Sequence, residues 1–284
     1  MESVPVDEKE PAGHTTKDRQ YIETVIIGTG FSAILAAIGL KKQNIADFIL
    51  FERDTDIGGT WRANSYPGAE VDIPTGLYSF SFVPYKFTKK YAPQSELLQY
   101  TNYVIDRFDI RKHTRTNHAV KNLTYDDSRC LWHVETEAGE SYDARFVIDA
   151  SGVLANPKIP YIEGAETFEG ASFHTARWDH SISCKGKKVG VIGSGCSGAQ
   201  VVPAIAGQVG RLTLFMGTPE WIIPRFDRNY SALERFIMTL PVVRQINRFM
   251  IFMVHEARFI GFRRYPLTKT VSKFIKKIYA RTLR

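Results

Sequence analysis

The feature that most constrains the fold is a pattern that occurs twice: an apolar run, a glycine-rich turn and a small-residue helix. The first copy leads from residues 24–27 through GTGFSA into residues 34–39, and the second leads from residues 188–192 through GSGCSG into residues 199–205. In such a unit the first glycine allows a tight turn and the second lets a pyrophosphate approach the backbone. The repeat therefore predicts an α/β protein with two Rossmann-like dinucleotide-binding domains, the second inserted in the first.

An acidic residue follows the second apolar run of the first unit. Residues 48–51 end in Glu52, which lies 52 − 28 = 24 residues after Gly28. This is near the spacing of an acid that accepts hydrogen bonds from a ribose, although an isolated surface acid after a strand is common. The helix start supplies free N–H groups and the positive end of its dipole for the phosphates. We therefore predict these dinucleotide contacts: Gly28, Gly30, Phe31, Ser32, Ala33 and Glu52.

The second glycine turn has the same form and leads to the same expectation. Its predicted contacts are Gly193, Ser194, Gly195, Cys196, Ser197 and Gly198. The chain has three cysteines, Cys130, Cys184 and Cys196, which are widely spaced. They match neither a disulfide framework nor a metal site, so we predict no metal, and disulfide reductases with closely spaced cysteine pairs are disfavoured. Cys196 is expected to serve as a small packing residue of the turn.

Charge is distributed unevenly along the chain. The net charge is +7, and residues 225–284 hold 14 Lys or Arg against 3 Asp or Glu, or +11, which leaves −4 for residues 1–224. A basic segment can bind nucleic acid or a membrane surface. No recognised nucleic-acid motif accompanies it, so solvated helix faces are the preferred interpretation and no nucleic-acid partner is predicted.

The chain shows no pattern of a secreted or membrane protein. Residues 1–20 are polar, without the apolar core of a signal peptide. The most apolar late stretch, residues 236–254, contains Pro241, Arg244 and Arg248, which makes it a poor membrane span. With few cysteines, the sequence predicts a reducing, cytoplasmic location and no transmembrane segment.

The segment between the two units carries a recognisable spacing of aromatic, glycine and histidine residues. In FEGASFHTARWD, residues Phe168, Gly170, His174, Trp178 and Asp179 resemble the fingerprint of Baeyer–Villiger monooxygenases, F-x-G-x-x-x-H-x-x-x-W followed by Pro or Asp. Flavin-containing monooxygenases of the sister type usually have Tyr in place of Trp178. The segment is therefore similar to the Baeyer–Villiger type.

A second stretch, GGTWRANSYPGAEVD at residues 58–72, resembles another motif of that family, G-x-W-x-x-x-x-Y-P-G-x-x-x-D. The resemblance implies that the Thr-Trp portion lines a flavin and that the closing acid, Asp72, lies beside the isoalloxazine as the catalytic carboxylate. It also implies further cofactor contacts at Gly59, Thr60, Trp61, Glu70, Val71, Tyr78, His174, Trp178, Gln200, Gly217 and Thr218. A β-meander over residues 119–150 is expected to cover the adenine of FAD, with Val120 as a backbone contact.

The family's reaction and architecture follow from the same resemblance. They imply FAD in the first domain, NADPH in the second, and a ketone and O₂ as partners. NADPH reduces the flavin, O₂ adds to form a C4a-peroxyflavin, and its attack on the ketone gives an ester or lactone. The expected segments are a lead-in (1–20), an FAD-binding domain (21–165), the first part of an NADP-binding domain (166–224) and an incomplete helical insertion (225–284). The sequence leaves the oligomeric state open.

Two departures from the family pattern keep alternatives open. Relatives usually have Gln-Arg where Met216-Gly217 stand, and that arginine grips the 2′-phosphate of NADPH. NADH is therefore possible as the reductant. The family's active-site arginine is expected downstream of residue 284. The alternatives to a Baeyer–Villiger enzyme are a heteroatom-oxidising flavin monooxygenase and a truncated, catalytically inactive nucleotide-binding remnant.

Overall fold

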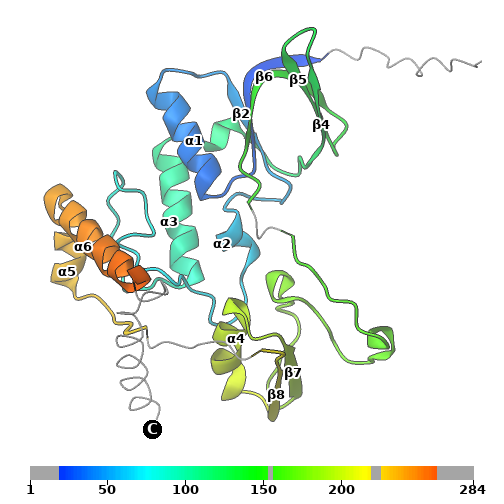
Figure 1. Ribbon diagram of the computed structural model, residues 1–284, viewed down its shortest axis with the longest axis vertical. Helices are drawn as coiled ribbons and strands as arrows, with labels where there is room; N and C mark the ends of the chain where they lie inside the picture. The colour runs from blue at the N-terminus through cyan, green and yellow to red at the C-terminus, as the bar shows by residue number, and fades with distance from the viewer. Residues whose placement is uncertain (1–18, 153–155, 219–224, 261–284) are drawn as a thin grey trace, which may run out of the picture. The chain divides into compact units, whose positions relative to one another are not determined.

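The computed structural model describes residues 19–152, 156–218 and 225–260. The chain divides into two compact units, one formed by residues 1–57 and 110–152 and the other by residues 58–109 and 153–284. Both contain parallel strands joined by a helix, so the α/β class predicted from the sequence is confirmed (Figure 1). The predicted lead-in falls almost entirely outside the described residues, as do residues 219–224 of the predicted second domain and residues 261–284 of the predicted helical insertion.

The first unit is built on a six-stranded sheet with the strand order β3-β2-β1-β6-β5-β4. Strand β1 (Gln20–Ile27) lies at its centre, parallel to β2 (Phe48–Phe51) and β6 (Ser141–Asp149). Val25 and Ile26 are completely buried, since a strand in the middle of a parallel sheet is covered on both faces. Helix α1 (Phe31–Lys42) packs against β1 and returns the chain to β2.

The other strands extend this sheet on both sides. Strand β3 (Thr114–Arg115), which follows the 3₁₀ turn η1 (Arg111–His113), pairs in parallel with β2. Strands β4 (Val120–Asp126) and β5 (Leu131–Thr136) form an antiparallel meander with β6. The predicted meander is therefore present, and its inward side chains join the central strands in one apolar cluster.

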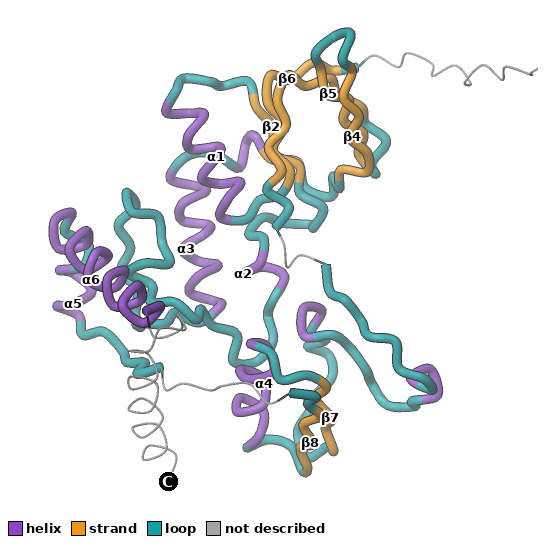
Figure 2. The backbone as a smooth tube through the Cα atoms, in the orientation of Figure 1, coloured by secondary structure: helices purple, strands orange, loops and turns teal. Residues whose placement is uncertain are grey.

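The second unit contains a shorter strand–helix–strand motif. Strand β7 (Lys188–Ile192) leads into α4 (Cys196–Ala206), and β8 (Arg211–Phe215) pairs with β7 in parallel (Figure 2). The 3₁₀ turns η2 (Ala165–Thr167) and η3 (Thr175–Arg177) lie in the segment before β7. Short helix α2 (Thr60–Ala63) and longer helix α3 (Gln94–Arg107) also belong to this unit.

An aromatic cluster around Tyr100 gives the second unit a further core. Tyr100 on α3 is fully buried, and the rings of Tyr85 and Phe87 lie 5.1 and 5.2 Å from its ring. Its hydroxyl accepts a hydrogen bond of 2.8 Å from the N–H of Phe80, which satisfies the polar atom in the core. Burial raises the pKa of Tyr100 well above its usual range, so the phenol stays neutral.

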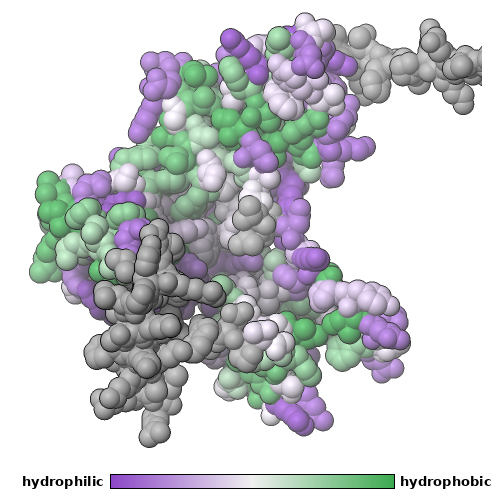
Figure 3. Space-filling view, in the orientation of Figure 1, coloured by the Kyte–Doolittle hydropathy of each residue, from purple (hydrophilic) through white to green (hydrophobic). Residues whose placement is uncertain are grey.

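Two helices follow at the end of the described chain. Helix α5 (Ala232–Ile237) begins with a capping box between Ser231 and Glu234, and α6 (Pro241–Ile260) runs for 20 residues. Apolar side chains gather over these helices (Figure 3), among them Phe249, which is 63% exposed. No described helix is both long enough and apolar enough to span a bilayer.

The first glycine turn should tolerate a side chain poorly. A methyl group at Gly28, where φ is +96°, would lie 2.7 Å from the carbonyl oxygen of Ala150. At Gly139, where φ is +85°, a methyl group would meet no atom within 4 Å. Gly139→Ala should therefore lower the free energy of unfolding by about 1–2 kcal/mol, because alanine is strained in a left-handed conformation. Gly28→Ala should lower the free energy of unfolding by ~1–3 kcal/mol more than Gly139→Ala does, because its methyl group also collides with Ala150.

The measurement is urea unfolding of both variants and the unaltered chain, followed by circular dichroism. Because both glycines have positive φ, the difference between the two variants isolates the close approach to Ala150. Equal unfolding free energies for the two variants would contradict this account of Gly28.

Candidate functional site

The first glycine turn brings the start of α1 to the carboxyl ends of β1 and β2. The N–H of Gly28 donates to the carbonyl of Phe51 at 2.8 Å, which fixes the turn to the end of β2. The N-cap residue of α1 is Gly30, which has no side chain to occupy the first N–H groups. Ala33 is completely buried, as a residue at the helix–strand contact should be. The turn therefore presents backbone donors at a helix N-terminus, the arrangement that binds phosphates.

Glu52 is held beside this turn by the turn itself. Its side chain is buried, with 6% of the residue exposed, and it accepts hydrogen bonds from the Thr29 hydroxyl and from the Asp54 N–H at 3.0 Å. The backbone of Glu52 is fixed as well, because its N–H donates to Arg115 and its carbonyl accepts from His118. A fixed carboxylate here can accept hydrogen bonds from a ribose. Thr29 was not predicted, because its position in the motif accepts any residue.

The second turn repeats the first in detail. The N–H of Gly193 donates to the carbonyl of Phe215 at 2.8 Å, and its φ is +104°. Gly195 is the N-cap of α4, and a methyl group at Gly193 or Gly195 would meet no atom within 4 Å. A methyl group at Gly198 would instead lie 2.5 Å from the carbonyl oxygen of Gly193. The open space at Gly193 and Gly195 leaves room for a bound pyrophosphate, and the close contact at Gly198 holds the helix against the turn.

The first turns of α1 and α4 hold the remaining predicted turn contacts. Helix α1 begins with Phe31 and Ser32, and helix α4 begins with Cys196 and Ser197. At these positions the backbone N–H groups point out of the helix end. Ser194 donates from its hydroxyl to the carbonyl of Thr218 at 3.4 Å. This bond ties the second turn to the chain that follows β8.

The two units differ at the end of the second strand. Ile27 pairs with Phe51 in the first unit and Ile192 pairs with Phe215 in the second, so Met216 occupies the place of Glu52. Met216 and Gly217 are both exposed. The second turn thus lacks the acid that would repel a 2′-phosphate, and Gly217 provides no cation to hold one.

Three of the predicted flavin contacts gather in the second unit. The indole N–H of Trp61 donates to the hydroxyl of Tyr78 at 3.2 Å, and the two rings meet edge to face at 5.7 Å. Burial raises the pKa of Tyr78, and the negative charge of Asp72 raises it further, against the opposing effect of the Trp61 hydrogen bond. Gln94 donates from its amide to the carbonyl of Trp61. The cluster offers two aromatic rings and one exposed carboxylate, Asp72.

The residues beside this cluster are fixed by backbone contacts. Gly59 is the N-cap of α2 with φ of +54°, and Thr60 is the first residue of the helix. Val71 is buried and its N–H donates to the carbonyl of Ala92 at 3.1 Å. The carboxylate of Glu70 forms an ion pair with Arg225. In the first unit, Val120 begins β4 and packs against the apolar cluster of the sheet.

The fingerprint segment 168–179 makes mainly packing and capping contacts among the described residues. The Trp178 ring packs against the apolar cluster of Tyr66, Ala69, Val201 and Ile205, and meets the Phe173 ring edge to face at 5.1 Å. His174 begins η3 and its Nδ1 accepts from the N–H of Ala176 at 3.1 Å. Phe168 is 65% exposed, and its ring lies over Gly170. The role of His174 and Trp178 as cofactor contacts stays a prediction.

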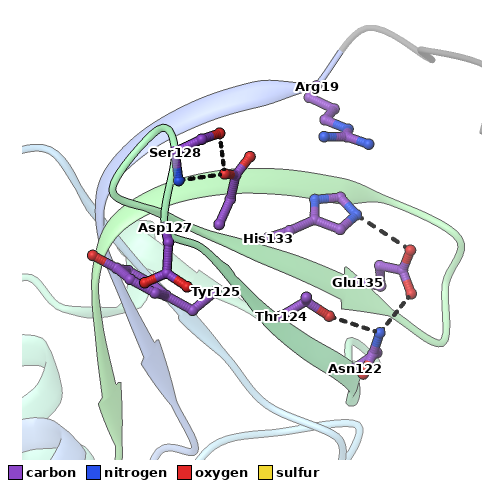
Figure 4. Close-up of a pocket in the computed structure, with 9 residues that line it drawn as sticks. Arg19, Asn122, Thr124, Tyr125, Asp127, Ser128, His133 and Glu135 are labelled. Carbon is purple, nitrogen blue, oxygen red and sulfur yellow. Dashed lines mark hydrogen bonds and ion pairs between the residues drawn. The ribbon is translucent and has the colours of Figure 1, made fainter.

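A cavity of about 770 Å³ lies elsewhere, on the meander of the first unit (Figure 4). Its lining includes Arg19, His133 and Glu135 and contains none of the predicted site residues. The polar groups bond to one another, as His133 does to Glu135 at 3.2 Å and Ser128 does to Asp126 at 2.6 Å. The cavity therefore gives no reason to move the candidate site away from the glycine turns and Asp72.

Comparison with known proteins gives consistent matches over most of the chain. The family described as pyridine nucleotide-disulphide oxidoreductase matches residues 25–234. A Baeyer–Villiger monooxygenase of Streptomyces coelicolor is 39% identical over 249 residues, which cover 87% of this chain and 48% of that protein. One from Pseudomonas aeruginosa is 36% identical over 264 residues, 92% of this chain and 50% of that protein. The chain thus spans about half the length of the curated relatives that it matches.

Solved structures show the same similarity. Cyclohexanone monooxygenase from Rhodococcus sp. Phi1 bound to NADP⁺ has a TM-score of 0.74 and 36% identity, covering 78% of this chain and 43% of that one. A complex of OTEMO with FAD and NADP has a TM-score of 0.73 and 31% identity, covering 84% of this chain and 44% of that one. These similarities confirm both the resemblance seen in the motifs and the predicted Rossmann-like fold.

The fingerprint residues should differ sharply in their effect on stability. Trp178→Ala removes a ring that packs against the cluster containing Val201 and Ile205 of α4. It should lower the free energy of unfolding by about 1–3 kcal/mol, which is less than the loss of a fully buried ring would cause. Phe168→Ala removes an exposed ring and should change it by less than about 0.5 kcal/mol. Urea unfolding curves of both variants test this difference, and a larger loss for Phe168→Ala would refute it.

Proposed function

The chain belongs to the pyridine nucleotide-disulphide oxidoreductase family, and we propose that it works as a Baeyer–Villiger monooxygenase. Such an enzyme uses FAD and a nicotinamide dinucleotide to insert one oxygen atom of O₂ into a ketone, giving an ester or lactone. The observation that carries the proposal is the cluster of Trp61, Tyr78 and Asp72. The rings of Trp61 and Tyr78 meet in the folded unit, and the charge of Asp72, from the same motif as Trp61, acts on Tyr78. The named relatives support it.

The cofactor assignment rests on the two turns. We assign the pyrophosphate of FAD to the first turn, with Glu52 accepting hydrogen bonds from its ribose. The nicotinamide dinucleotide is assigned to the second turn, where the space in front of Gly193 and Gly195 is open. The similar structures that hold NADP⁺, or FAD and NADP, support both assignments. We also propose a cytoplasmic setting, in keeping with the three free cysteines.

The residues of the cluster have separate roles in this proposal. Bound FAD supplies the chemistry of oxygen activation. Trp61 and Tyr78 give the flavin ring an apolar wall, and the hydrogen bond between them fixes both ring planes. Asp72 places a negative charge at the cluster and is the residue through which the protein tunes the electrostatics of the reacting atoms. The raised pKa of Tyr78 keeps its hydroxyl neutral beside that charge.

Loss of the Asp72 charge should separate oxygenation from flavin binding. In a protein that also carries the half of the relatives that this chain does not span, Asp72→Ala should retain bound FAD, measured by visible absorbance after gel filtration, and should reduce ester formation from a cyclic ketone about 10²-fold or more. Asp72→Asn, which keeps the shape and removes the charge, should be as impaired. Ester formation is measured by gas chromatography with NADPH and FAD supplied.

The same assay on the unaltered form of that longer protein, with a sulfide beside the ketone, distinguishes the alternatives. Oxidation of the sulfide alone would favour a heteroatom-oxidising enzyme. A chain that binds FAD but oxidises neither compound would retain the flavin-binding assignment and lose the oxygenation assignment. Undiminished ester formation in Asp72→Ala would remove Asp72 from the proposed role.

The choice between NADPH and NADH should respond to residue 217. Gly217 is exposed, and a side chain there would meet no atom within 4 Å. Gly217→Arg should tighten NADP⁺ binding about tenfold or more relative to NAD⁺, since a guanidinium forms charge-assisted bonds to the 2′-phosphate. Gly217→Ala fills the same space without charge and is the matched control. Calorimetric titration measures both ratios, and an unchanged ratio in the arginine variant would contradict the assignment of this strand end.

A further inference from the structure

The segment that ends at Asp72 is held from three directions. Three consecutive carbonyl groups before Asp72 each accept one hydrogen bond, and each donor comes from a different part of the second unit. The pairs are Ala69 with the Gln94 N–H at 2.8 Å, Glu70 with the Gln200 amide at 2.9 Å, and Val71 with the Arg225 guanidinium at 3.3 Å. We call residues 66–72 the Asp72 segment. These three hydrogen bonds hold the backbone of the segment in place, and they thereby set the position from which the Asp72 side chain extends.

Gln200 uses both ends of its amide on this segment. Its Nε2 donates to the carbonyl of Glu70, and its Oε1 accepts from the hydroxyl of Tyr66 at 2.8 Å. An amide with donor and acceptor both engaged holds one orientation. Tyr66 begins the Asp72 segment and Glu70 lies four residues further along it, so Gln200 of α4 bridges two separate points of the segment.

The loop also packs closely on α4. A methyl group at Gly68 would lie 2.6 Å from the backbone oxygen of Gln200 and 2.9 Å from Cβ of Ala204. Tyr66 and Ala69 are buried in the same cluster as the helix residues Val201 and Ile205. The Asp72 segment is thus part of the core of the strand–helix–strand motif that carries the second glycine turn.

Arg225 holds the far end of the segment by charge. Its guanidinium pairs with the carboxylate of Glu70 and lies 4.7 Å from the centre of the Tyr91 ring. Lys89 pairs with Asp227 at 2.7 Å and lies 3.9 Å from the Glu70 carboxylate. Burial opposes the effect of Lys89, and the balance lowers the pKa of Asp227. This network fixes the end of the segment independently of Gln200.

We propose that Gln200 is a positioning residue that transmits dinucleotide binding at the second glycine turn to Asp72. Gln200 is the fifth residue of α4, one turn along the helix whose N-terminus forms the proposed phosphate site. Ordering of that helix end restrains Gln200, and Gln200 restrains the carbonyl two residues before Asp72. The inference rests on the proposed function, because it takes the second turn as the dinucleotide site.

Hydrogen exchange of the 284-residue chain, followed by mass spectrometry with and without NADP⁺, tests the relay. NADP⁺ should slow exchange in peptides that cover residues 193–198 and also in those that cover residues 66–72. In Gln200→Leu, compared at NADP⁺ concentrations that protect residues 193–198 to the same extent as in the unaltered chain, the protection of residues 66–72 should disappear. Without NADP⁺, residues 66–72 should exchange about tenfold faster in Gln200→Leu than in the unaltered chain, since two hydrogen bonds are lost.

The chain offers a matched control just after the same helix. Gln208 lies just beyond α4 and donates to the carbonyl of Ala204 at 3.2 Å, away from the Asp72 segment. Gln208→Leu should preserve both protections. Tyr66→Phe removes only one of the two bonds and serves as a milder variant, with a smaller loss of protection, should Gln200→Leu fail to fold.

The outcomes separate the relay from the proposed function. Persistence of the NADP⁺ protection of residues 66–72 in Gln200→Leu, or its absence in an unaltered chain whose turn is protected, would overturn the relay. Absence of protection at the turn with both NADP⁺ and NAD⁺ would overturn the dinucleotide site and the relay together. The experiment without NADP⁺ then still decides whether Gln200 positions the segment, because unchanged exchange in Gln200→Leu would overturn that role too.

Discussion

The structure depends on a steric constraint that applies at two places: a helix must begin directly at the carboxyl end of the strand before it. Gly28 and Gly193 meet this constraint with positive φ values, and each donates its N–H to the last carbonyl of the neighbouring strand. This bond joins the turn to the strand pair, so the helix N-terminus opens at the end of the parallel strands. The phosphate sites follow from this backbone geometry before any side chain contributes.

The sequence predicted these turns well because their determinants are local. A β-branched run, two glycines and a small residue specify the turn within a dozen positions, and Glu52 falls at a fixed distance along the chain. Thr29 escaped prediction, since nothing in the sequence says that its hydroxyl bonds to Glu52. The network of Gln200, Tyr66 and Arg225 escaped for a different reason. Gln200 and Arg225 lie more than 100 positions after the residues that they contact, Tyr66 and Glu70, so these contacts form only in the folded chain.

The packing around α4 also explains why two sequence motifs have residues at fixed positions. Tyr66 comes from the segment that ends at Asp72, and Trp178 comes from the fingerprint, which lies between the two glycine turns in the sequence. Both side chains join one apolar cluster with Val201 of α4. A pattern in the sequence can therefore reflect the core that supports a site as much as the site itself. The described contacts of the Trp178 ring are all explained by its packing in this cluster and against Phe173.

The electrostatics of the Asp72 cluster follow from the unequal burial of its members. Asp72 is exposed, whereas Tyr78 is partly buried and burial raises its pKa. The negative charge of Asp72 acts in the same direction, because it disfavours a second anion nearby. The hydrogen bond from Trp61 opposes both effects without reversing them. The raised pKa of Tyr78 therefore keeps the phenol uncharged around neutral pH, so that the phenol adds no second negative charge beside Asp72.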